Sequence, residues 1–112
     1  MNQNNSMNRE NILEALANSC ITFTPESFRP FLMSDAIIVT MPTKDVFYSF
    51  FNRMVNYSKN ITTGKLHLKV EKVPFEENQF YYNFYDEVHQ FARLTIVVTF
   101  LEEKIELDVM PF

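Results

Sequence analysis

The spacing of the hydrophobic residues changes once along this chain, at its only glycine, Gly64. Before Gly64 the apolar residues recur at helical spacing, and after it they alternate with polar residues. In the segment 65–73 this alternation is regular, and Leu66, Leu68 and Val70 are expected to face inward. Helices followed by a meander of strands predict an α+β fold, in which N-terminal helices pack on an antiparallel sheet.

Three helices are predicted before Gly64. The first covers about residues 9–19 and begins at Asn8, whose side chain is a typical N-cap. The second is about one turn long and is introduced by Thr24 and Pro25. The third covers 44–58 and starts after Thr43. Its buried stripe is expected to contain Val46, Phe47, Phe50, Phe51, Met54 and Val55.

Five strands are predicted. Residues 35–41 are apolar on both alternating faces, which is typical of a strand that is covered on both sides. The other four form the meander and cover 65–73, 79–85, 90–100 and 103–110.

The length of 112 residues fits a single domain over 9–112, preceded by a polar, disordered N-terminus at 1–8. With 46% hydrophobic residues and 12 phenylalanines, the core should be bulky and aromatic. No signal peptide and no apolar run long enough for a membrane helix is found. Cys20 is the only cysteine and favours a reducing, cytoplasmic compartment.

The charge distribution argues against nucleic acid as a partner. The net charge is −4, and the basic residues are scattered among acidic ones instead of forming one face.

A protein partner is more plausible, because the outer faces of the two middle strands of the meander are moderately apolar and aromatic. We therefore expect a homodimer through this face, with the following residues in contact: Tyr81, Tyr85, Arg93, Thr95 and Val97. The alternative is that these residues merely favour strands and tolerate water.

The order of elements resembles the NTF2-like superfamily, which is also described as cystatin-like or SnoaL/ketosteroid-isomerase-type. The resemblance rests on "FRPFLMSDAIIV", on "DVFYSFF" as the start of the third helix, and on a meander ending in "TFLEEKIELDV". It covers about residues 9–110. It implies a sheet curved around a long helix, forming a cone that can hold a small molecule. Members include isomerases, dehydratases, binding proteins and accessory domains, so this fold does not decide the function.

Two departures from the family pattern weaken an isomerase interpretation. The place of the general base in ketosteroid-isomerase-like members falls at about Thr40, which cannot act as a base near neutral pH. Asp35 corresponds to the family's turn aspartate and is more simply a structural cap. The usual glycine before the last strand is also replaced, by Glu103.

Other residues with reactive side chains give weak signals. His67 lies on a charged strand face, and His89 lies beside Asp86 in a polar turn that could also form an acid–imidazole pair. Cys20 is expected to be buried in the first helix. No cofactor motif and no set of metal ligands is found, so neither a cofactor nor a metal is predicted.

Two functional hypotheses remain. The first is a non-catalytic NTF2-like domain that acts by association, as a homodimer or with another protein. The second is a small apolar-molecule binding protein, or an isomerase- or dehydratase-like enzyme, that uses the cone interior. For the second, the expected ligand-binding residues are Tyr82, Thr40, Phe47, Phe51, Met54 and Phe80. An interior filled by phenylalanine side chains would favour the first hypothesis, and an apolar cavity the second.

Overall fold

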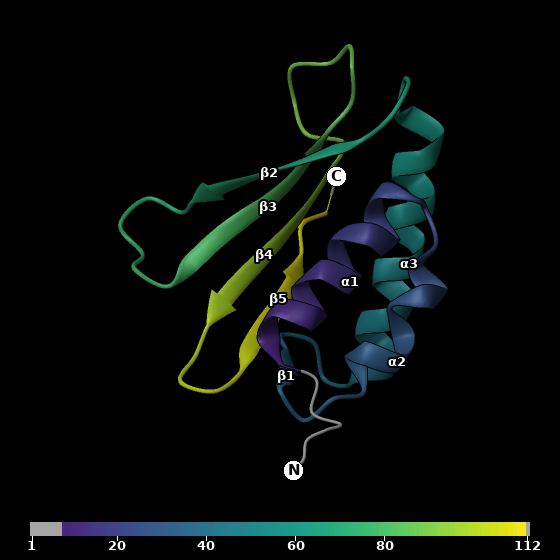
Figure 1. The fold of residues 1–112 in the computed structure, drawn as a ribbon. Helices are drawn as coiled ribbons and strands as arrows, with labels where there is room; N and C mark the ends of the chain where they lie inside the picture. Colours follow the sequence, from purple (N-terminus) through teal and green to yellow (C-terminus); the bar gives the residue numbers. More distant parts are fainter. Residues whose placement is uncertain (1–7, 112) are drawn as a thin grey trace.

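The computed structural model describes residues 8–111 and shows three helices on one side of a five-stranded sheet (Figure 1). The predicted α+β class is confirmed. The helices are α1 (Arg9–Ile21), α2 (Arg29–Leu32) and α3 (Lys44–Ile61), and a 3-10 turn, Pro25–Ser27, precedes α2. The strands are β1 (Ile37–Val39), β2 (His67–Lys72), β3 (Gln79–Tyr85), β4 (Leu94–Phe100) and β5 (Ile105–Val109). Apart from Asn8, the predicted disordered N-terminus lies outside the described residues.

The two long helices begin where their N-caps predict. The Asn8 side chain accepts a hydrogen bond from the backbone N–H of Asn11 at 2.9 Å, and the Thr43 side chain accepts one from Val46 at 3.1 Å. The region around Thr24 differs from the prediction, because its side chain contacts the Ser27 hydroxyl at 3.1 Å instead of capping a backbone N–H. The chain there forms a 3-10 turn followed by a separate helical turn.

The sheet has the order β1-β5-β4-β3-β2. The meander from β2 to β5 is antiparallel, as predicted. β1 pairs in parallel with β5, with Ile37 opposite Ile105, so the complete sheet is mixed. The expectation that this first strand is covered on both faces is wrong: β1 is a short edge strand, and 37% of Ile38 is exposed. Only one face of β1 can meet the helices, because all three helices lie on the same side (Figure 1).

The core lies between the helices and the sheet and is aromatic, as the phenylalanine content predicts. Phe51 of α3 is fully buried, with ring centroids 5.7 Å from Phe28 and 6.0 Å from Phe47. From the sheet, Phe84 and Ile96 are fully buried on the helix-facing side, which we call the inner face. Burying a side chain of this size stabilises a fold by about 1.5–3 kcal/mol.

The helices do not cover the whole inner face. β2 lies at one edge of the sheet, away from α3 (Figure 1), and 47% of Val70 is exposed although its side chain is on the inner face. Leu68, Phe80 and Tyr82 are only half-buried on the same face. The predicted facing of β2 therefore agrees with the register, but its burial is incomplete although α1 contacts this strand.

Candidate functional site on the outer face of the sheet

The predicted contact residues of β3 and β4 lie side by side on the outer face of the sheet, the side away from the helices. Tyr81 is opposite Val97, and Asn83 is opposite Thr95. The strand expected at 90–100 begins only at Leu94, so Arg93 precedes β4, and its backbone N–H donates to the carbonyl of Phe84 at 2.7 Å. The structure thus brings four of the five predicted residues into one band: Tyr81, Tyr85, Thr95 and Val97.

Polar side chains across three strands of this face are joined in one hydrogen-bond network. The Thr95 hydroxyl donates to Asn83 Oδ1 at 2.5 Å, and Asn83 Nδ2 donates to Glu71 Oε1 at 2.7 Å. The Tyr85 hydroxyl donates to the same Glu71 oxygen at 2.9 Å. Sequence reasoning did not include Glu71 in the site. The sequence indicates only that Glu71 points outward from β2. Its position near Tyr85 depends on the pairing of β2 with β3, which the sequence alone does not give.

The network shifts the pKa values of its two titratable members, Glu71 and Tyr85, away from neutrality. Hydrogen bonds from Asn83 and then Tyr85 lower the pKa of the Glu71 carboxyl. The same bond to Glu71 raises the pKa of the Tyr85 phenol, with burial adding to the shift. Near neutral pH the carboxylate is therefore ionised and the phenol neutral, which is the state in which Tyr85 donates to Glu71.

The residues expected to line a cone are separated in the structure. Phe47 and Phe51 are fully buried and Met54 is 6% exposed, all within the core on α3. The side chain of Tyr82 lies on the inner face of β3 and is half-buried, and burial raises its pKa. Thr40 is exposed and donates to Asp108 Oδ1 at 2.8 Å, on the outer face. Thr40 and Tyr82 thus lie on opposite faces of the sheet, and the ligand-binding role of the set stays a prediction.

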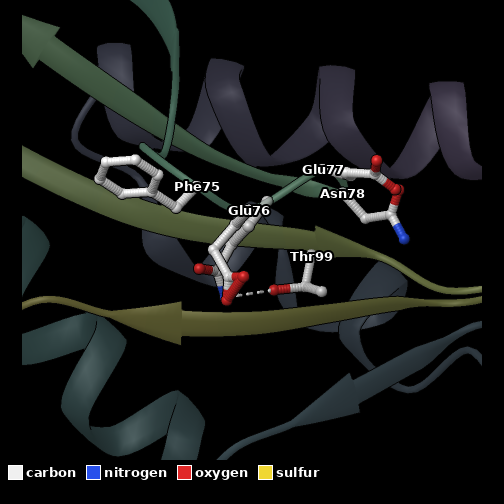
Figure 2. Close-up of a pocket in the computed structure, with 6 residues that line it drawn as sticks. Phe75, Glu76, Glu77, Asn78 and Thr99 are labelled. Carbon is white, nitrogen blue, oxygen red and sulfur yellow. Dashed lines mark hydrogen bonds between the residues drawn. The ribbon is translucent and has the colours of Figure 1, made fainter.

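Two surface hollows are large enough for a small molecule. One, of about 330 Å³, lies along α3 and includes Met54 with Phe50 and Arg53. Another, of about 370 Å³, lies at the β2–β3 turn, where Gln79 Nε2 donates to the Thr99 hydroxyl at 3.0 Å (Figure 2). Neither hollow brings Tyr82 and Phe80 together with the α3 residues.

The acid–imidazole pair of the β3–β4 loop does form. Asp86 Oδ2 lies 2.8 Å from His89 Nδ1 and accepts from the Thr63 N–H at 2.8 Å. Asp86 Oδ1 accepts from the backbone N–H groups of Val88 and His89 at 3.0 and 2.7 Å. Burial alone would raise the pKa of Asp86, but these hydrogen bonds outweigh it and lower the pKa well below its usual range. The pair ties the loop to the chain just after α3, so its contacts are structural.

The remaining reactive side chains do not converge. Cys20 is fully buried, and burial raises the pKa of its thiol. Among residues 8–111 no three His, Cys, Asp or Glu side chains lie close enough to hold a metal ion. None of the helices described is both long and apolar enough to cross a membrane.

No family model, curated protein or solved structure matches this chain. The resemblance to the NTF2-like superfamily therefore stays an expectation that rests on the order and spacing of the elements.

Proposed function

We propose that this chain is a non-catalytic association domain that binds a second copy through the outer face of its sheet. The observation that supports this best is the lateral network of Glu71, Asn83, Tyr85 and Thr95. It spans β4, β3 and the edge strand β2 on a sheet face that no helix covers, and the apolar side chain of Val97 and the ring of Tyr81 lie beside it.

The network lowers the desolvation penalty of covering this face. A buried polar group without a hydrogen-bond partner costs about 1–3 kcal/mol, which ordinarily opposes association. Here the hydroxyl of Thr95, the amide of Asn83 and the hydroxyl of Tyr85 already have partners within the same chain. A partner can therefore cover these groups with little loss of hydrogen bonding, and tyrosine is a favoured contact residue.

The alternative, a small apolar ligand in the interior, has weaker support. Phe47 and Phe51 are fully buried, and Phe51 packs against both Phe47 and Phe28, so these rings occupy the space under α3. The two chemical groups that sequence analysis favoured, Thr40 and Tyr82, are on opposite faces.

Sedimentation equilibrium of the wild type and of Val97→Glu tests the proposal. We expect the wild type to self-associate, and Val97→Glu to lose this contact because it buries a carboxylate next to Asp108, its neighbour in β5. Val46→Glu is the matched control. The expectation that Val46 belongs to the buried stripe of this helix is wrong, since it is 48% exposed on α3, on the other side of the molecule. A monomeric wild type, or an unchanged assembly in Val97→Glu, would contradict the proposal.

A further inference from the structure

β2 presents an open main-chain edge. It is the last strand in the sheet order, and no strand within residues 8–111 pairs with its other side. The Val73 N–H donates to the Gln79 carbonyl at 3.0 Å, so Val73 and Gln79 form a hydrogen-bonded pair. This pair belongs to the register in which His67 lies opposite Tyr85. Because bonded pairs alternate in an antiparallel ladder, Leu68, Val70 and Lys72 direct their N–H and C=O groups away from β3. An edge of this kind is a template for another strand.

The side chains along this edge are charged on one face and apolar on the other. Lys69 and Glu71 point to the outer face, with side chains 65% and 38% exposed, and Val70 lies between them on the inner face. Pro74 follows β2 and has no N–H, so the open edge ends there. The edge is therefore short, and a basic and an acidic residue flank its centre.

We propose that β2 pairs antiparallel with β2 of a second copy, with Val70 opposite Val70 across a two-fold axis. In this register the two Val70 residues exchange both of their main-chain hydrogen bonds, and Leu68 of each copy exchanges bonds with Lys72 of the other. All main-chain groups that these three residues direct outward are then paired. The two five-stranded sheets become one continuous sheet, with the helices of both copies on the same side.

Charge complementarity selects this register and this partner. With Val70 at the axis, Lys69 of each copy lies opposite Glu71 of the other, in the close, non-hydrogen-bonded positions of the ladder. Two other registers, shifted by two residues in either direction, also keep the inner faces of the two sheets on the same side. One places Lys69 opposite Lys69 and the other places Glu71 opposite Glu71, and like charges in directly opposite positions are unfavourable. A lysine on an edge strand ordinarily repels other strands, and here a second copy supplies the acid that accommodates it.

Glu71 is already oriented for this contact. Its Oε1 atom is held by Asn83 and Tyr85, and its Oε2 atom lies 4.0 Å from Lys69 Nζ of the same chain. Little side-chain freedom remains to be lost when Lys69 of a second copy approaches Oε2, which favours binding.

The main-chain ladder of the edge contact is separate from the Tyr81–Val97 contact of the outer face, although Glu71 lies beside both. The edge contact rests on the proposed function only in that both are self-association. Its two-fold axis is perpendicular to the sheet, whereas the axis of a face-to-face contact lies in the plane of the sheet. The two contacts can coexist, and each doubles the number of chains in the assembly. Removing one contact halves the number of chains in the assembly and leaves the other contact in place. The failure of either proposal can therefore be seen separately.

Sedimentation equilibrium of the full chain tests the edge contact, up to about 1 mM to include weak association. Val70→Pro removes an N–H that points away from β3, so the fold should persist while the number of chains in the assembly halves. Thermal unfolding checks that the variant is folded. The edge contact would be overturned if folded Val70→Pro assembled like the wild type. It would also be overturned if Val97→Glu alone converted the wild-type assembly to monomer, or if the wild type were monomeric.

Charge reversal at Lys69 and Glu71 provides a second test, which examines the register. Lys69→Glu and Glu71→Lys each place like charges opposite one another twice, and each should weaken self-association by about tenfold or more. The double variant Lys69→Glu/Glu71→Lys restores opposite charges and should reassemble. An equimolar mixture of the two single variants should form a mixed dimer, because each acid then faces a lysine. A mixture or a double variant that stays as weak as the single variants would contradict the proposed register.

Discussion

The interior of the molecule offers a quantitative test of whether it is a packed core or a ligand site. Phe51 is fully buried on α3 and its ring lies 5.7 Å from Phe28 and 6.0 Å from Phe47. Burial of such a ring contributes about 1.5–3 kcal/mol, and each aromatic contact adds about 0.5–1.5 kcal/mol. We therefore expect Phe51→Ala to lower the free energy of unfolding by about 4 kcal/mol, within the usual range for Phe→Ala in cores.

The expected change in melting temperature follows from the length of the chain. At about 2.1 cal/mol/K per residue, 112 residues give an unfolding entropy of about 0.24 kcal/mol/K. A loss of about 4 kcal/mol then lowers Tm by about 17 °C, which circular dichroism during heating measures directly. Because domains of this size have about 5–15 kcal/mol of stability in total, a urea titration should accompany the thermal scan.

Phe75→Ala is the matched control for this experiment. Phe75 is fully exposed at the β2–β3 turn (Figure 2), and its replacement should change the free energy of unfolding by no more than about 0.5 kcal/mol. If Phe51→Ala cost less than about 1 kcal/mol, the ring would not be packed as described. The interior would then have room for a ligand, and the reasoning against the ligand-binding hypothesis would fail.

Two further predictions concern titratable side chains in the fold. The folded pKa of Asp86 is depressed, so its contribution to stability is complete above its ordinary pKa of 3.8 and decreases as the pH falls below that value. Stability measured against pH should therefore fall less steeply on the acid side in Asp86→Asn than in the wild type, and parallel curves would contradict this. Cys20 should resist a thiol reagent at pH 8 in the folded protein and react after unfolding in urea, because burial raises its pKa. Rapid reaction in the folded state would show that the thiol is accessible.

The sequence predicts those features of the fold that depend on local chemistry. The caps at Asn8 and Thr43 and the alternation after Gly64 are signals carried by neighbouring residues. Gly64 itself adopts a left-handed conformation with φ +81° just after α3, which is favourable for glycine. Each of these signals is independent of the rest of the chain, which explains why the corresponding elements were placed correctly.

The features that were not predicted depend on contacts between distant segments. The apolar run 35–41 indicates a strand, but only its parallel pairing with β5 at the sheet edge explains why Ile38 is exposed. Alternation likewise assigns Val70 to the inner face without showing whether a helix covers it. The position of Glu71 beside Tyr85 depends on the β2–β3 register, and a shift of one residue would reverse the face of every side chain in β2.

Glu71 connects the two surfaces that this structure offers for association. On the outer face its Oε1 atom accepts hydrogen bonds from Asn83 and Tyr85, so these two side chains already have a partner within the chain. At the β2 edge the same carboxylate is held in place to meet a lysine of a second copy. Because one side chain serves both arrangements, a substitution of Glu71 should weaken both contacts. Val70→Pro and Val97→Glu test the two contacts separately, since no residue is shared between the main-chain ladder of the edge and the Tyr81–Val97 contact of the face.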